Sequence, residues 1–448
     1  NMDQERLHVS VIGPSSAGKS TLIASLLVHT GQPVPNGKPV RSLVDKGPFE
    51  RIMGRSLHCS YHVYQTDLHN YVFYDNPGVR HIRRTARSVS IADTVILHLS
   101  AEMPESDLKS LRQFALMPYV YGIKQIFVVV SKMDSERVKY SQEKFRSLQQ
   151  QIQDVLHRVG YKPAQVTYIP VSATTLENVT HKQENGPMSW YEGAPLIYAL
   201  QTAPQNVYPT DQPFMMAIPR RYHTNRENTT TAFGRILSGK VSEGMTVVTP
   251  KGVEFVVKSI QTFGTNIKSA EAGEVVGIRF KTRGAVTKVK GEKQWQFKAR
   301  ALETRPDPRY HILSGSTLCE ASPGLPAATE DFHCKVIIMK RKFNIEDYSI
   351  PTMRAHVACG PVRWVAFEKV FDRKGNVKAE NPLVVSKGDV VHIRCKCLFP
   401  ALLQPHTDFP SMGRIFFHFN DEIIAAGVVL RSDGAISSGR KTKAATRC

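Results

Sequence analysis

The first two hundred residues alternate short apolar runs with longer segments of helical character. The apolar runs are rich in β-branched and aromatic residues and occupy positions 7–12, 71–74, 94–99, 125–130 and 166–171. Strand-like runs that alternate with helical segments are typical of a parallel sheet with helices on both faces. We therefore predict an α/β domain, in which ligands bind at the carboxyl ends of the strands.

After residue 210 the helical segments disappear and the pattern becomes entirely β. Short apolar runs, separated by Gly, Pro and Asp turns, lie at 247–249, 253–257, 275–280, 334–339 and 390–394. Many short strands between such turns predict small barrels. The predicted fold is therefore an α/β domain followed by two all-β barrel domains.

The chain has 448 residues, which is too long for one ordinary core, so several domains are expected. We expect breaks near residues 208–213 and 322–329. The predicted units are a nucleotide-binding domain at 1–205, barrels at 211–323 and 329–433, and a basic, flexible tail at 434–448.

The segment GPSSAGKST, residues 13–21, follows an apolar strand and opens a helical segment. A glycine-rich turn in that position predicts a phosphate-binding loop, because backbone NH groups and the helix amino terminus both attract anions. The Lys19 ammonium can reach the outer phosphates, and the Ser20 hydroxyl can bind Mg²⁺. The remaining nucleotide contacts predicted in this loop come from Gly13, Ser16, Ala17, Gly18 and Thr21. A chance Gly/Ser turn before a helix is the alternative.

Two further motifs follow later predicted strands. In YDNPG, the Asp75 carboxylate can hold Mg²⁺ through a water molecule, and the Gly78 NH can meet the terminal phosphate. In VVVSKMD, Asp134 can accept two hydrogen bonds from a guanine edge while the stem of Lys132 covers the ring. Each motif alone resembles many ordinary turns.

A fourth motif, VSA, contains Ser172 and Ala173, and a backbone NH there can reach the guanine carbonyl oxygen. The four motifs together, in this order and spacing, predict a site for GTP or GDP with Mg²⁺.

The net charge and the cysteine content limit which partners and which cellular compartment are expected. Lys and Arg number 59 against 39 Asp and Glu, a net charge of +20, which favours a phosphate-rich partner such as RNA; a basic protein kept soluble by its charge is the alternative. The seven cysteines show no zinc-type spacing, so reduced thiols are expected. No signal-peptide pattern opens the chain and no apolar run approaches the ~20 residues of a membrane span, which predicts a cytoplasmic protein without a membrane partner.

The motifs resemble the guanine-nucleotide domain of translational GTPases, and the rest of the chain resembles the elongation factor 1-alpha group. That group includes elongation factors, class-two termination factors and Hbs-type rescue GTPases. The segments that carry the resemblance beyond the first domain are MSWYEG at 188–193, YPTDQP at 208–213, GRILSGKVSEGM at 234–245, MRAHVAC at 353–359 and DFPSMGR at 408–414. The resemblance implies an α/β P-loop GTPase domain followed by barrels that grip a tRNA or a tRNA-shaped protein.

The chain departs from the family at positions that bear on hydrolysis. The family has a histidine after the DxPG glycine, which positions the attacking water, and this chain has Val79. A valine cannot hydrogen-bond water, so no residue is assigned as a catalyst and slow or ribosome-dependent GTP hydrolysis is expected. Rescue by His81, two residues on, would require a rearranged loop.

Further departures concern nucleotide affinity. Ser131 replaces a family asparagine that stabilises the loop and contacts the base, so we expect guanine preference to weaken without being lost. Pro14, Ser15 and Ser16 replace His, Val and Asp in the phosphate loop. Ser56 is expected to replace the switch threonine as a third Mg²⁺ ligand beside Ser20 and Asp75, although the alignment there admits other positions.

The segment 281–300 is an insertion relative to the family, with seven basic residues and the aromatics Trp295 and Phe297. Such a mixture suits RNA, and a hairpin with a solvated basic face is equally compatible. The tail beyond residue 433 is expected to be disordered or to lie on RNA.

The resemblance implies a GTP-binding factor that delivers aminoacyl-tRNA to the ribosomal A site. Its expected partners are the ribosome, aminoacyl-tRNA or a tRNA-like protein factor, and a nucleotide exchange factor. Val79 and Ser131 leave open an alternative, a GTP-held scaffold of the termination, rescue or RNA-surveillance branch.

Overall fold

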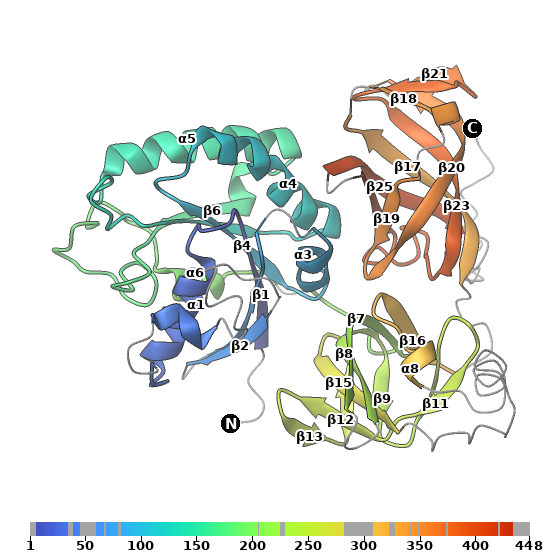
Figure 1. Ribbon diagram of the computed structural model, residues 1–448, viewed down its shortest axis with the longest axis horizontal. Helices are drawn as coiled ribbons and strands as arrows, with labels where there is room; N and C mark the ends of the chain where they lie inside the picture. Colours follow the sequence, from blue (N-terminus) through green and yellow to red (C-terminus); the bar gives the residue numbers. More distant parts are fainter. Residues whose placement is uncertain are drawn as a thin grey trace, which may run out of the picture. The chain divides into compact units, whose positions relative to one another are not determined.

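The computed structural model describes residues 6–34, 39–44, 60–66, 69–78, 82–204, 206–224, 229–281, 308–321, 328–340, 342–347, 350–372, 375–419 and 422–432. The chain divides into two compact units, residues 1–206 and 207–448 (Figure 1). The first unit is an α/β layer structure and the second consists of β-sheets. This confirms the predicted fold class, an α/β domain followed by β-rich domains.

The first unit is built on a six-stranded sheet with the strand order β2-β3-β1-β4-β5-β6. The strands are β1 Arg6–Ile12, β2 Ser60–Gln65, β3 Asn70–Asp75, β4 Thr94–Ser100, β5 Ile126–Ser131 and β6 Val166–Pro170. All neighbouring pairs are parallel except β2 with β3, which is antiparallel. The prediction of a parallel sheet is therefore right for five strands and missed the antiparallel edge strand β2.

Helices cover both faces of this sheet, as Figure 1 shows. They are α1 Lys19–His29, α3 Ile82–Val89, α4 Glu105–Tyr121, α5 Gln142–Val159 and α6 Leu196–Leu200. Leu22 and Leu26 of α1 and Leu196 of α6 share one buried core with the central strands. The other face is covered by α3, α4 and α5. Burial on both faces explains why β3, β4 and β5 are continuous runs of buried residues rather than alternating ones.

The second unit begins with an eight-stranded antiparallel sheet in the order β11-β10-β16-β7-β8-β15-β12-β13, with the pair β14-β9 beside it. The strands are β7 Met215–Thr224, β8 Thr229–Ser238, β9 Lys240–Ser242, β10 Thr246–Val248, β11 Glu254–Val256, β12 Ser259–Thr262, β13 Thr265–Ile267, β14 Ser269–Glu271, β15 Val275–Lys281 and β16 Ser316–Glu320. Helix α8, Pro308–His311, precedes β16. Phe214, Ile236 and Phe280 lie in the buried core that this eight-stranded sheet encloses.

The rest of the second unit contains a closed barrel. The order β19-β24-β25-β17-β23-β20 returns to β19 through the β19–β20 pairing, so six strands form a ring, with β21 added to β20. The elements are β17 Thr329–Ile338, β18 Lys342–Asn344, β19 Thr352–Ala355, β20 Ala358–Phe371, β21 Val377–Glu380, β22 Val384–Ser386, β23 Val390–Ala401, β24 Arg414–Phe419 and β25 Glu422–Ser432. Strands β18 and β22 pair separately. Closure removes the exposed edges of the ring.

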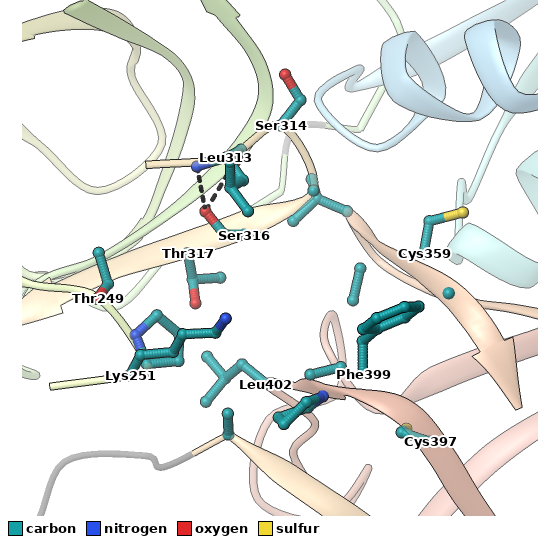
Figure 2. A pocket seen from close by; sticks show the side chains of 18 of the residues that line it. Thr249, Lys251, Leu313, Ser314, Ser316, Thr317, Cys359, Cys397, Phe399 and Leu402 are labelled. Atoms are coloured by element: carbon teal, nitrogen blue, oxygen red, sulfur yellow. Dashed lines mark hydrogen bonds between the residues drawn. The ribbon is translucent and has the colours of Figure 1, made fainter. Parts of the chain in front are cut away.

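An apolar seam joins the two β parts of the second unit. Met215, Leu237 and Cys319 of the first part pack with Leu402 and Met412 of the second in one buried cluster. Beside this cluster lies a cavity of about 290 Å³ that residues of both parts line. Figure 2 shows the side chains of its lining, among them Thr317, Phe399 and Leu402. The seam makes the two β parts one compact unit.

The cysteines of the described residues are free thiols, as expected. Cys319, Cys334, Cys395 and Cys397 are buried, and Cys359 is exposed. Burial raises the pKa of the Cys319 and Cys397 thiols to about 12, which keeps them protonated and unreactive. Within the same described part of the chain, no helix is long and apolar enough to cross a membrane.

Candidate nucleotide-binding site

The predicted phosphate loop connects β1 to α1 at the carboxyl edge of the sheet. Gly13 has φ 148°, and a methyl group there would collide with the backbone oxygen of His98. Gly18 has φ 105°, and its added carbon would lie 3.3 Å from Cε1 of His98. Gly13 therefore requires glycine for both its backbone conformation and its close approach to His98, and Gly18 favours glycine for its left-handed backbone conformation. Ser16, with φ 62°, forms the left-handed turn between them.

Lys19 lies beneath this loop at the start of α1. Its side chain is buried, and Nζ donates to the backbone oxygens of Gly13 at 3.1 Å and Pro14 at 2.7 Å. Burial lowers the pKa of Lys19 to about 8, and the charge of Asp75 opposes that shift. The lysine thus ties the loop to the helix and places a cation where the loop NH groups converge.

Ser20 and Asp75 meet at the end of β3, next to the loop. The Ser20 hydroxyl donates to Asp75 Oδ2 at 2.7 Å, and the Asp75 side chain is fully buried. A hydroxyl and a carboxylate side by side are oxygen donors of the kind that Mg²⁺ prefers. The residues present therefore fit the predicted metal. Ser56, the third predicted ligand, lies outside the described residues, and Thr21 follows Ser20 in α1.

Gly78, the residue predicted at the terminal phosphate, packs against the phosphate loop. A carbon added at Gly78 would come 2.7 Å from the backbone nitrogen of Ser15 and would also collide with its hydroxyl. The backbone of the Asp75–Gly78 turn is therefore in direct contact with the loop, and only glycine permits that approach. Val79 and His81 lie outside the described residues.

Ser131 ends β5 and reaches the phosphate loop from the neighbouring strand. Its Oγ lies 2.8 Å from the backbone oxygen of Ala17 and 3.0 Å from that of Leu99. Serine lacks the amide of the family's asparagine, but its shorter hydroxyl still bonds the loop directly. The expected weakening of guanine preference stays a prediction.

The residues predicted to bind guanine lie after β5 and β6. Lys132 adopts a left-handed conformation with φ 59°, and its Nζ lies 4.0 Å from Glu102 Oε2. The Asp134 carboxylate accepts a hydrogen bond from Thr174 Oγ1 at 2.7 Å, and Thr174 Oγ1 lies 2.9 Å from Ser172 Oγ. Ala173, between the two hydroxyl residues, is buried. The third and fourth motifs are thus joined by one chain of side-chain hydrogen bonds.

The Thr174 contact yields a prediction about base selectivity. A carboxylate offers about four acceptor positions, so Thr174 can orient Asp134 while guanine N1 and N2 donate to the others. Thr174→Val keeps the shape of the side chain and removes the hydroxyl. We expect the ratio of GTP to ITP affinity to fall about three- to tenfold, the effect of one hydrogen bond. Calorimetric titration with both nucleotides measures that ratio.

The matched control for that change is Thr167→Val. Thr167 lies in β6 near its amino end, away from the carboxyl edge, and accepts a weak bond from Gln125 at 3.4 Å. The control should bind both nucleotides like the unaltered chain. Equal weakening of GTP and ITP by Thr174→Val would contradict an orienting role for this hydroxyl.

His98, which the sequence interpretation did not select, lies directly under the phosphate loop. The imidazole is fully buried, and neither ring nitrogen has a hydrogen-bond partner among the described residues. Burial, together with the charges of Lys19 and Lys132, lowers the pKa of His98 to about 3. The ring is therefore neutral and packs as part of the floor of the loop. A histidine inside an otherwise apolar strand was the available signal.

The geometry defines a class of protein, a P-loop nucleotide-binding domain of the GTPase type followed by β domains. Comparison with known families gives the group. Residues 4–234 match the elongation factor Tu GTP-binding domain, and residues 331–430 match the C-terminal domain of the elongation factor 1-alpha type. The first match alone covers more than half of the chain. The chain belongs to the elongation factor 1-alpha group of translational GTPases.

Individual relatives agree with this assignment over the whole length. Elongation factor 1-alpha of Methanothermobacter thermautotrophicus is 27% identical over 441 residues, spanning 96% of this chain and 98% of the relative. The same factor from Archaeoglobus fulgidus is 29% identical over 447 residues, again spanning 96% and 98%. The recognised family is therefore confirmed, and with it the capacity of the fold to bind GTP or GDP.

Solved structures show the same fold at lower identity. The Ski7 GTPase-like domain of S. cerevisiae bound to GTP has a TM-score of 0.71 at 15% identity, covering 95% of this chain and 97% of the other. Elongation factor SelB of Methanococcus maripaludis with a GTP analogue has a TM-score of 0.64 at 18% identity, covering 96% and 80%. These likenesses extend the shared fold across all domains.

Proposed function

We propose that this chain is a GTP-binding translation factor that delivers aminoacyl-tRNA to the ribosomal A site. The observation that carries the nucleotide part is the convergence of Lys19 under the phosphate loop with the Ser20–Asp75 pair beside it. The proposed role in translation is inferred from the family to which the chain belongs. The proposed nucleotide contacts are Gly13, Ser16, Ala17, Gly18, Lys19, Ser20, Thr21, Gly78, Ser131, Lys132, Asp134, Ser172 and Ala173.

Mg²⁺ is proposed as the accompanying ion, held by Ser20, by Asp75 through water, and by Ser56. When bound, Mg²⁺ neutralises charge on the outer phosphates. The chain's own residues bring the triphosphate to one place: Lys19 supplies a fixed cation, and the loop backbone supplies NH donors. Asp134, oriented by Thr174, selects guanine by accepting from its edge.

We further propose that hydrolysis is slow without the ribosome, because Val79 occupies the position of the family's water-positioning histidine. Val79→His is therefore expected to raise the rate of single-turnover GTP hydrolysis, measured without ribosomes, by about two orders of magnitude or more, as for other water-orienting residues. Affinity for GTP should stay within about twofold, since the change adds a group that acts on water. A rate that is already fast and does not respond to this substitution would contradict the proposal.

The partners proposed are the ribosome, an aminoacyl-tRNA or a tRNA-like protein factor, and a nucleotide exchange factor, in the cytoplasm. The net charge of +20 suits a polyanionic partner. A carrier of aminoacyl-tRNA should bind it far more tightly with GTP than with GDP, because the nucleotide shifts the population of the binding-competent form.

The second candidate is a GTP-held scaffold that carries a tRNA-like protein in termination, rescue or RNA surveillance. Val79 and Ser131 favour it, and the Ski7 GTPase-like domain, solved with GTP bound, shares the fold. Such a scaffold would hold GTP without turning it over and would not need to distinguish aminoacyl-tRNA.

One experiment separates the candidates. Purified protein is titrated with fluorescent GTP, GDP and ATP, with and without Mg²⁺, and then mixed with ribosomes for single-turnover hydrolysis. Guanine-specific binding with ribosome-stimulated hydrolysis supports the elongation-type factor. Binding without hydrolysis supports the scaffold, and absence of guanine-specific binding overturns both.

A further inference from the structure

A buried polar side chain, Asn76, stands between the predicted metal ligand Asp75 and the predicted phosphate contact Gly78. Asn76 is fully buried. Its Nδ2 faces three acceptors: Ser10 Oγ at 3.0 Å and the backbone oxygens of Val11 and Tyr74, both at 3.1 Å. Three oxygens around one nitrogen fix the orientation of the amide.

The other end of the amide reaches the helix that follows the turn. Asn76 Oδ1 accepts from Ser88 Oγ of α3 at 2.7 Å. Ser88 Oγ also lies 2.9 Å from Ser10 Oγ and 2.8 Å from the backbone oxygen of Thr85. Ser10 and Ser88 are both buried. One small network therefore joins β1, the end of β3 and α3, in a core where unpaired polar groups are costly.

The network acts on the short turn that contacts the phosphate loop. Two residues after Asn76, the backbone of Gly78 lies against Ser15, so close that no side chain fits. On the other side, the residue directly before Asn76 is bonded to Ser20. The turn is thus held at Asp75 by the loop helix, at Asn76 by the network, and at Gly78 by contact with the loop.

We propose that Asn76 is a positioning residue for the terminal phosphate of GTP, which through Ser10 and Ser88 holds the Asp75–Gly78 turn and α3 in the arrangement that receives that phosphate. The inference rests on the proposed function, since it assigns a role within the same site. Ligands that use the Gly78 NH benefit from a turn that is already in place, because the apparent affinity scales with the populated fraction of the competent form. GDP lacks the terminal phosphate, so the preformed turn adds nothing to its affinity.

The test compares Asn76→Ala, Ser88→Ala and the double substitution in the full chain. Affinities for GDP and for a non-hydrolysable GTP analogue are measured by calorimetry with Mg²⁺. Asn76→Ala should weaken the GTP analogue about tenfold and GDP less than about twofold. Ser88→Ala should act in the same direction, and the double substitution should add little to Asn76→Ala, since both belong to one network.

Ser90→Ala is the matched control. Ser90 follows α3 and donates to the backbone oxygen of Arg87 at 2.9 Å, outside the network, so its loss should change neither affinity. Equal weakening of both nucleotides by Asn76→Ala would indicate a purely structural role and overturn the proposal, as would unchanged affinities. Ser88→Ala keeps the proposal testable if Asn76→Ala does not fold.

Failure of the proposed function gives a different result. If the unaltered chain binds neither nucleotide, the GTP-binding proposal falls, and the network is judged from amide hydrogen exchange of α3 in the nucleotide-free chain. Asn76→Ala should then speed exchange in α3 about tenfold relative to Ser90→Ala, because local opening becomes easier. Exchange that matches the control would overturn the positioning role by itself.

Discussion

Lys19→Met is expected to lower the affinity for GTP by more than a hundredfold. The substitution keeps the apolar stem and removes the buried ammonium, which bonds the backbone oxygens of Gly13 and Pro14 in this structure. Truncating one partner of a buried, hydrogen-bonded charge pair costs about 2–5 kcal/mol of binding free energy. A loss of about 3 kcal/mol, within that range, already corresponds to a more than hundredfold loss of affinity. Isothermal titration with GTP and GDP measures the loss.

The loss at Lys19 has two sources that a control separates. One is the missing cation on the phosphates, and the other is the missing link between the loop and α1. Lys162→Met removes an exposed lysine just before β6 at the opposite edge of the sheet, so it tests the general effect of one positive charge and should stay within about twofold. An affinity loss of similar size in both variants would assign the effect to net charge and contradict a local role for Lys19.

The sequence predicted the nucleotide motifs because those motifs are local. A phosphate loop needs its glycines, lysine and serine within one turn between a strand and a helix, so residues 13–20 carry the pattern by themselves. Asp75, Ser131 and Asp134 each follow an apolar run that becomes a buried parallel strand. The order of these strands in the sheet brings the motifs to one edge, the carboxyl ends of the strands, where ligands of α/β domains bind.

The polar contacts that link the motifs could not be predicted in the same way. Asn76 and Ser88 are 12 residues apart and Ser10 is 66 residues from Asn76, and nothing local distinguishes a serine in a buried network from one on a surface. Thr174 follows the VSA motif directly, yet its bond to Asp134 spans 40 positions. Partners of this kind are fixed by sheet order and helix packing, which single-sequence patterns do not contain.

Strand ends were missed for a related reason. The prediction stopped one strand at residue 394, whereas β23 runs to Ala401. From Arg394 onward the strand alternates the exposed Arg394 and Lys396 with the buried Cys395 and Cys397. Half-buried alternation with lysine and cysteine gives a weak apolar signal, although one face still packs into the closed barrel. Edge strand β2, with His62 and Tyr64 turned inward, escaped prediction for the same reason.

The second large effect concerns stability and pH. The buried imidazole of His98 has a pKa lowered to about 3, against about 6.5 in an unfolded chain. Below pH 6.5 the unfolded chain therefore binds a proton that the folded chain does not, so the free energy of unfolding falls as the pH falls. Between pH 7 and pH 5 this one histidine is expected to remove about 2 kcal/mol from the stability of the first unit.

His98→Leu should abolish that loss, since leucine takes no proton and the imidazole nitrogens make no hydrogen bond within the described residues. Urea denaturation at pH 7 and pH 5, with amide exchange of β4 and β5 to follow the first unit, gives the two free energies. The difference between them should shrink by about 2 kcal/mol in His98→Leu and stay unchanged in His157→Leu, at an exposed position of α5. If the free energy of unfolding changed by the same amount between pH 7 and pH 5 in His98→Leu and in the unaltered chain, the imidazole would be gaining its proton in the folded state too. That outcome would mean that water reaches the ring beneath the phosphate loop.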